Sequence, residues 1–331
     1  MSLVGRTIRN RYEISKRLGS GGFGETYLAK DTDLPSDREC VVKHLQPRTS
    51  EPAVLVIAKR LFNSEAIVLD KLGKHNQIPT LYAHFEENDE FYLVQEFING
   101  YDLDKELIPG QQLSEDEVIE LLQGILEVLA FVHQEGVIHR DIKPSNLMRR
   151  QKDQRFVLID FGAVKEISTL ALGVTQGLVS PTVAVGTPGY MPREQIEGYP
   201  QLCSDVYAVG IVGIQALTGL QPKEFKDPTT GKQIWRKHVP DSKGLADILD
   251  KMVREDYTER YQTALEALQA LKALQAPNKP VPPQPWKWRT WRDVVIALTG
   301  IGIGALSLLF VQHLLPSQQQ QQTEIPTPIQ P

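Results

Sequence analysis

Three side chains in the run IHRDIKPSNL, residues 138–147, could together transfer a phosphoryl group: Asp141, Lys143 and Asn146. A carboxylate such as Asp141 can accept the proton of an attacking hydroxyl, and an ammonium such as Lys143 can neutralise charge that builds on the transferred group. The amide oxygen of Asn146 can bind magnesium. These residue types in one short loop predict a catalytic loop for phosphoryl transfer.

A second metal ligand is predicted at Asp160, which follows the run RFVLI at 155–159 and begins the tripeptide Asp-Phe-Gly. The apolar run is typical of a buried strand, and a carboxylate at its end can supply oxygen to magnesium. The tripeptide alone could be any junction between a strand and a turn. Its place after the catalytic loop favours a metal site formed by Asn146 and Asp160.

A glycine-rich run, LGSGGFG at 18–24, contains the spacing G-x-G-x-x-G, which can bring backbone N–H groups close to phosphates. The spacing alone is a weak signal, because dinucleotide-binding proteins share it. Here the β-forming residues Thr26, Tyr27 and Leu28 follow the last glycine, where a dinucleotide site would begin a helix. The run is therefore predicted to form a glycine hairpin over a triphosphate.

A lysine on one element and a glutamate on another are predicted to form an ion pair. Lys43 lies on the expected strand 39–45, and Glu65 lies on the expected helix 60–72, whose apolar face contains Leu61, Val68, Leu69 and Leu72. A buried carboxylate without a partner is strongly destabilising, so a cation is expected beside it. An exposed strand lysine and a half-exposed edge of the apolar face are the alternatives.

The catalytic loop, the Asp-Phe-Gly tripeptide and the glycine hairpin followed by a strand lysine resemble those of the eukaryotic-type (Hanks-type) serine/threonine protein kinases. The segments GFGETYLA at 22–29, DFGAVK at 160–165 and GTPGY at 186–190 look most like the bacterial, especially the cyanobacterial, branch. The resemblance covers residues 12–274. It implies an α+β, two-lobed protein kinase fold with a small β-rich N-lobe and a larger helical C-lobe.

This resemblance implies transfer of the γ-phosphate of ATP to serine or threonine hydroxyls of protein substrates, with Mg²⁺, or alternatively Mn²⁺, as the metal. Asp141, Lys143 and Asn146 match the catalytic residues of the family, and Asn146 and Asp160 match its metal ligands. The positions that match the nucleotide contacts of the family are Leu18, Gly19, Gly21, Gly22, Phe23, Gly24, Thr26, Val41, Lys43, Glu65, Glu96, Ile98, Asp102 and Met148.

Several other contacts are implied in the same way. The backbone at Glu96 and Ile98 matches the adenine site, and Asp102 matches the ribose contact. The family also leads us to expect an ion pair between Glu194 and Arg260. Within the C-lobe we expect hydrogen bonds from the catalytic-loop backbone to Asp205, and hydrogen bonds that join Thr187 with Asp141 and with Lys143.

Arg140 directly precedes the predicted base. Kinases often use an arginine at this place to bind a phosphate on the activation loop. We therefore expect an activating phosphate, added by autophosphorylation, at Thr175, Ser180 or Thr182.

Composition limits the class of protein. The chain has 331 residues and a formal net charge of -5, which gives no reason to expect a nucleic-acid partner. Its only cysteines, Cys40 and Cys203, argue against a disulfide framework or a zinc site and suit a reducing compartment. We expect a cytosolic catalytic domain of residues 12–274, preceded by a short N-terminal segment, 1–11.

The C-terminal part of the chain predicts a membrane anchor. Residues 275–293 combine a proline-rich linker with the basic and aromatic collar WKWRTWR, and residues 294–315 contain no Asp, Glu, Lys or Arg. At a rise of ~1.5 Å per residue, the second stretch is long enough to cross a hydrocarbon core. A buried core helix and a helix lying on the membrane are the alternatives, and the collar and the lack of a polar face favour a single-pass transmembrane helix.

The cations before the span place the kinase domain in the cytosol, and the polar, Gln-rich tail 316–331 then lies on the opposite side. No hydrophobic signal lies near Met1, so cleavage and secretion are not expected. Gly300 and Gly304 form the pattern G-x-x-x-G, which can bring two membrane helices together in a homodimer.

Two other functions fit part of the pattern. An ATP-binding pseudokinase scaffold would usually lack a residue that matches Lys43, Asp141 or Asp160, and all three are present. A small-molecule kinase would not be expected to carry the long activation segment that ends in residues 186–194.

Overall fold

The computed structural model describes residues 2–20, 24–36, 38–45, 52–88, 90–161, 165–166, 186–224, 227, 229–230, 234–239 and 243–275. The chain divides into two units, Met1–Ala276 and Pro277–Pro331. The predicted span 294–315 and the tail 316–331 lie outside the described residues, as does the linker apart from its first residue. Among the described residues, no helix has the length and apolar character needed to cross a membrane.

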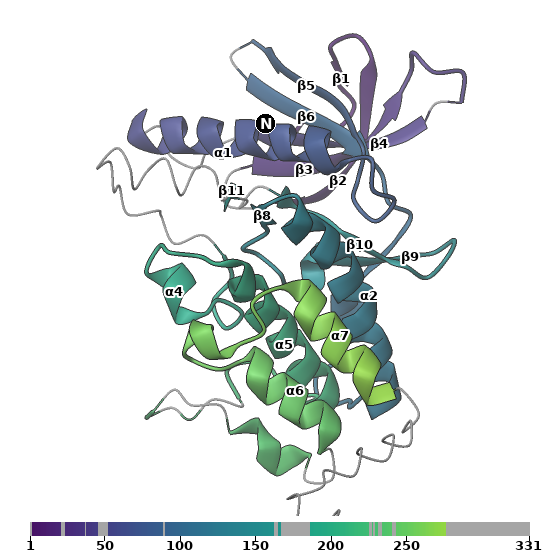
Figure 1. The fold of residues 1–331 in the computed structure, drawn as a ribbon. Coiled ribbons are helices and arrows are strands. Elements are labelled where there is room, and N and C mark those ends of the chain that lie inside the picture. Colours follow the sequence, from purple (N-terminus) through teal and green to yellow (C-terminus); the bar gives the residue numbers. More distant parts are fainter. Residues whose placement is uncertain are drawn as a thin grey trace, which may run out of the picture. The chain divides into compact units, whose positions relative to one another are not determined.

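The small lobe is an antiparallel sheet with the strand order β1-β2-β3-β4-β6-β5. Helix α1 packs beside β4 and β5 (Figure 1). The bounds of these elements are β1 Thr7–Ile8, β2 Tyr12–Ser20, β3 Gly24–Asp31, β4 Arg38–Leu45, α1 Pro52–Leu72, β5 Leu81–Glu87 and β6 Glu90–Glu96.

The two faces of this sheet bury different side chains, because successive residues of a strand point to opposite sides. Cys40 and Val42 of β4 pack in a cluster on the face away from α1, whereas Leu45 packs in the cluster that contains the buried residues of α1. By the same alternation, Val41 and Lys43 share the face of Leu45. The strand therefore directs Lys43 toward α1.

The N-terminal residues belong to the small lobe. Strand β1 pairs with β2, and the N–H groups of Gly5 and Ile14 donate to the carbonyls of Ile14 and Arg6, both at 2.9 Å. Leu3 is buried in the cluster that contains Tyr27. Residues 1–11 are predicted as a separate segment before the domain, but the described part of this segment packs onto the sheet.

The large lobe is mainly helical. Its α-helices are α2 Glu115–Gln134, α4 Arg193–Ile196, α5 Leu202–Thr218, α6 Gly244–Met252 and α7 Ala264–Gln275, and its 3-10 helices are η1 Leu103–Lys105, η2 Pro144–Asn146, η4 Trp235–His238 and η5 Tyr257–Glu259. Strands β10 Phe156–Leu158, β9 Leu147–Arg150 and β7 Gly100–Asp102 form one small sheet, and β8 Val137–Ile138 pairs with β11 Lys165–Glu166.

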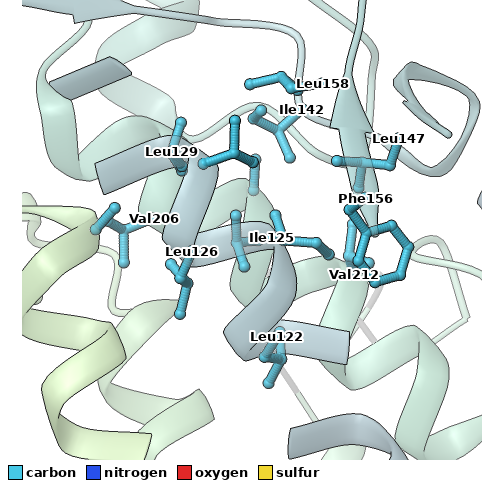
Figure 2. Packing of buried hydrophobic residues seen from close by; sticks show 14 of the residues in the cluster. Leu122, Ile125, Leu126, Leu129, Ile142, Leu147, Phe156, Leu158, Val206 and Val212 are labelled. Carbon is cyan, nitrogen blue, oxygen red and sulfur yellow. The ribbon is translucent and has the colours of Figure 1, made fainter. Parts of the chain in front are cut away.

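Two helices form the base on which the catalytic loop lies. Every residue of α5 from Cys203 to Thr218 is buried, so this helix has apolar contacts on all sides. Figure 2 shows side chains of α2, among them Ile125 and Leu129, packed with Leu147, Phe156 and Val206. The two strands that flank the catalytic loop, β8 and β9, rest on this core.

Candidate active site

The three predicted catalytic residues lie close together within the connection 139–146 between β8 and β9. Oδ2 of Asp141 accepts from Nδ2 of Asn146 at 3.0 Å and lies 2.8 Å from Nζ of Lys143. Oδ1 of Asp141 accepts from the hydroxyl of Thr187 at 2.8 Å, and this hydroxyl accepts from Nζ of Lys143 at 2.8 Å. The expected contacts of Thr187 are confirmed, and they hold the carboxylate of Asp141 in one orientation.

The backbone of the catalytic loop is fixed by Asp205 of α5, as expected. Its Oδ2 accepts from the N–H of His139 and its Oδ1 accepts from the N–H of Arg140, both at 2.8 Å. Arg140 has a φ of 71°, in the left-handed region that side-chain-bearing residues seldom adopt. Such a conformation persists only where surrounding contacts impose it. The two hydrogen bonds to Asp205 are contacts of this kind, directly before Asp141.

His139 connects the catalytic loop with the segment that carries Asp160. Its Nδ1 accepts from the N–H of Asp141 at 3.3 Å, so its Nε2 carries the proton and donates to the carbonyl of Ile159 at 3.1 Å. Burial lowers the pKa of His139, which favours this neutral form. The ring meets Phe161 edge-on, with centroids 4.9 Å apart. Sequence reasoning used His139 only as part of a motif and gave it no role.

The predicted ion pair between Lys43 and Glu65 is confirmed, and Asp160 joins it. Nζ of Lys43 contacts Oε1 of Glu65 and lies 3.2 Å from Oδ1 of Asp160. The lysine lowers the pKa of Asp160, whereas burial raises the pKa of Glu65. Three elements, β4, α1 and the segment after β10, therefore meet at one ammonium group.

The predicted metal ligands fit magnesium. Asn146 turns its amide nitrogen to the carbonyl of Asp141 at 2.8 Å and to the carboxylate of Asp141, which leaves the amide oxygen as the atom to face a cation. Oδ1 of Asp160 contacts Lys43, so Oδ2 is the carboxylate oxygen that could bind the metal. Magnesium is usually held by one or two such protein ligands together with waters and substrate phosphates.

The predicted nucleotide residues, as far as they are described, lie on the strands and helix α1 of the small lobe, between β6 and β7, and on β7 and β9 of the large lobe. Thr26 pairs with Lys43 across β3 and β4 and with Gly19 across β2 and β3, and Gly24 begins β3. Asp102 pairs with Met148 across β7 and β9. Leu18 is exposed, Val41 and Ile98 are buried, and Glu96 ends β6. Gly21, Gly22 and Phe23 lie outside the described residues.

The expected ion pair between Glu194 and Arg260 is present and buried in the large lobe. Nη1 and Nη2 of Arg260 bind Oε1 and Oε2 of Glu194 at 2.6 and 3.1 Å, and the hydroxyl of Ser204 donates to Oε1 at 2.7 Å. Both charged residues are buried. This confirms the expected pair and anchors the segment that carries Thr187.

Comparisons with known proteins agree with this geometry. The serine/threonine-protein kinase PknA of Nostoc sp. is 44% identical over 260 residues, covering 78% of this chain and 46% of the relative. Serine/threonine-protein kinase C of Synechocystis sp. is 45% identical over 262 residues, covering 78% of this chain and 49% of the relative. The chain thus spans about half the length of these relatives.

Among solved structures, the kinase domain of Mycobacterium tuberculosis PknI matches with a TM-score of 0.61 and 22% identity, over 82% of this chain and 99% of that chain. This likeness supports the two-lobed fold. A family model described as protein kinase domain matches residues 12–273. The chain belongs to the protein kinase family.

Proposed function

We propose that the protein is a serine/threonine protein kinase that transfers the γ-phosphoryl group of ATP to protein hydroxyls. The observation that carries this proposal is the network in which Lys143 and Thr187 hold the carboxylate of Asp141. The similarity to relatives named serine/threonine-protein kinases supports the same reaction. Lys143, two residues after the base, and Thr187 favour serine and threonine over tyrosine as acceptors.

The reaction forms a bond from the substrate oxygen to the γ-phosphorus, breaks the bond to the β–γ bridging oxygen, and releases ADP. Asp141 accepts the hydroxyl proton, and Lys143 stabilises the charge on the transferred group. Lys43, positioned by Glu65 and Asp160, binds the α- and β-phosphates. Bound magnesium supplies further neutralisation of phosphate charge.

The test is phosphate transfer from labelled ATP by Asp141→Asn. We expect transfer to fall by ~10²-fold or more, because the general base is lost. Binding of ADP, measured by calorimetry, should remain within about threefold, because the base does not hold the nucleotide. The exposed Asp116→Asn is the matched control. Near-normal transfer by Asp141→Asn would refute the mechanism, and a wild-type chain that binds ATP without transfer would favour the pseudokinase scaffold.

We also propose that residues 294–315 anchor the kinase domain to a membrane as a single-pass helix, with the domain in the cytosol and the tail on the opposite side. The charge-free stretch and the collar before it support this topology. The full chain should sediment with membranes, and a chain that ends at residue 293 should not. Protection of the kinase domain from protease in sealed cytosol-side-out vesicles would contradict the orientation.

Dimerisation through Gly300 and Gly304 would bring two kinase domains together and favour phosphorylation of one by the other. The predicted acceptors Thr175, Ser180 and Thr182 lie outside the described residues. We expect Gly300→Leu with Gly304→Leu to lower phosphorylation of these residues in membranes, as measured by mass spectrometry. Ile301→Leu with Ile303→Leu is the control in the same span, and equal phosphorylation of both double variants would contradict the coupling.

A further inference from the structure

His133, near the end of α2, joins two parts of the large lobe and has no role in the reaction described above. The side chain is buried. Its Nε2 lies 3.1 Å from Oδ2 of Asp205, and its Nδ1 lies 3.1 Å from the backbone nitrogen of Ala264, the first residue of α7. The imidazole thus bridges the helix α7 and the carboxylate that fixes the catalytic loop.

The two contacts determine the tautomer of His133. A backbone N–H can only donate, so Nδ1 must present its lone pair to Ala264. The ring proton then lies on Nε2, which donates to Asp205. His133 is therefore a neutral imidazole that accepts on one side and donates on the other.

Asp205 depends on this donor. The carboxylate is buried, and it accepts from the N–H groups of His139 and Arg140 as well as from His133. A buried carboxylate is tolerated only where hydrogen bonds replace its hydration. Two of the three donors are the catalytic-loop backbone, in which Arg140 adopts its left-handed conformation. Without the donor from His133, the buried carboxylate of Asp205 would lack one hydrogen bond and could change its orientation. The backbone N–H groups of His139 and Arg140 would then lose their fixed acceptor.

We propose that His133 is a positioning residue for phosphoryl transfer, because it orients Asp205 and so holds the backbone that precedes Asp141. This inference rests on the proposed kinase function. It also assigns a role to the start of α7, whose Ala264 N–H fixes the tautomer of His133. Helix α7 ends at Gln275, where the predicted linker to the membrane begins.

The test compares His133→Leu with His133→Gln in the full chain. Leucine neither donates nor accepts, whereas the glutamine amide can donate to Asp205 and accept from Ala264. We expect kcat to fall about tenfold in His133→Leu and to remain within about threefold of wild type in His133→Gln. The affinity for ADP with magnesium should change by less than about twofold in both, because His133 is not a nucleotide contact.

Val132→Ala, at the neighbouring buried position of α2, is the control for a loss of packing alone. It should lower the unfolding temperature and leave kcat within about twofold when assayed well below that temperature. The proposal would be overturned if His133→Leu and His133→Gln lost the same amount of kcat. It would also be overturned if the loss of kcat in each variant only followed its loss of stability, as in Val132→Ala.

Hydrogen exchange provides a readout that does not depend on activity. The amides of His139 and Arg140 donate to Asp205, so a peptide that contains them should exchange faster in His133→Leu and regain protection in His133→Gln. Unchanged exchange in His133→Leu would overturn the positioning role. Absence of transfer by the wild-type chain would instead overturn the proposed function, and the exchange comparison would still decide whether His133 holds the loop.

Discussion

Lys43 remains charged because two carboxylates face its ammonium group. Burial alone would lower the pKa of its ammonium group, and the negative charges of Asp160 and Glu65 outweigh this and raise it. Glu65 is itself buried, and burial raises its pKa. The three groups therefore stabilise one another's charges only while α1 and the segment after β10 stay in place.

Glu65→Gln tests this dependence. The amide keeps the shape of the side chain and removes the charge, so Lys43 should be drawn toward Asp160 and away from the phosphates. We expect kcat/KM for ATP to fall at least about tenfold, while stability changes by only ~1 kcal/mol because Asp160 still pairs with Lys43 and Glu65 no longer has to be buried as a charge. Steady-state kinetics and thermal unfolding measure the two effects. Asp70→Asn, on the exposed side of α1, should change neither, and full activity of Glu65→Gln would show that the pair is dispensable.

The sequence predicted Glu65 as a partner of Lys43, but it did not predict Asp160 as a second partner or any contact of His133, for a physical reason. Glu65 lies in an apolar helical stripe, which marks a buried carboxylate that needs a cation. Thr187 and Asp205 could be expected only through the resemblance to kinases. His133 bonds to groups 72 and 131 positions away along the chain. No local pattern reports such contacts, because they arise from the packing of α2, α5 and α7.

The connection between α1 and β5 fixes the small lobe to the strand that leads to Asp160. The N–H of Leu158 in β10 donates to the carbonyl of Gln77 at 2.9 Å, and Nε2 of Gln77 donates to the carbonyl of Phe156 at 2.8 Å. Nη1 of Arg150 donates to the carbonyl of Asn76 at 2.6 Å. Since Glu65 lies on α1 and Asp160 follows β10, these bonds help to set the distance between the two carboxylates that hold Lys43.

Gln77→Leu should loosen this connection. The carbonyl of Phe156 would lose its donor inside the protein, which costs about 1–3 kcal/mol. Activity should fall by more than the loss of folded protein explains. The magnesium concentration needed for the half-maximal rate should also rise, because Asp160 is less well placed to bind the metal. Asn76→Ala is the control, since only the backbone of Asn76 takes part in the contacts described. An unchanged magnesium requirement in Gln77→Leu would argue that the connection supports the fold without positioning Asp160.

Elements with strong periodicity were predicted more reliably than short or context-dependent ones. The helix expected at 60–72 exists but begins at Pro52, and the strand expected at 155–159 is Phe156–Leu158. Strand β1 has two residues, Thr7 and Ile8, and it is defined by pairing with β2 rather than by its own pattern. The N-terminal segment was therefore not recognised as part of the sheet.

Of the two hydrophobic clusters, one is confined to the small lobe and the other extends across both lobes. One lies on the face of the small-lobe sheet away from α1 and contains Cys40. The other joins buried residues of α1 with those of the large-lobe helices, so Leu69 and Leu72 pack in the same cluster as Leu126 and Val206. Helix α1 is thus tied to both lobes by packing, and we expect the domain to lose its structure as one cooperative unit.

The two cysteines provide the measurement, because Cys40 lies in the small lobe and Cys203 lies in α5. Burial raises the pKa of Cys40 to about 12 and that of Cys203 to about 11. An unfolded cysteine titrates near ~8.5. The folded chain keeps protons that the unfolded chain releases, so this contribution to stability is complete below ~pH 8.5 and is lost progressively as the pH rises toward the folded values.

Urea unfolding at pH 7.5 and at pH 10, under reducing conditions, should show a loss of stability at the higher pH of up to ~2 kcal/mol per thiol. Buried tyrosines, among them Tyr12 and Tyr27, also have a raised pKa and contribute to this loss. The double variant Cys40→Ser with Cys203→Ser removes the contribution of the thiols, so it should lose less stability between pH 7.5 and pH 10 than wild type. In wild type, both thiols should become reactive toward a thiol reagent at the same urea concentration. Reaction of Cys40 well before Cys203 would mean that the small lobe opens independently, and that packing through α1 does not couple the two lobes.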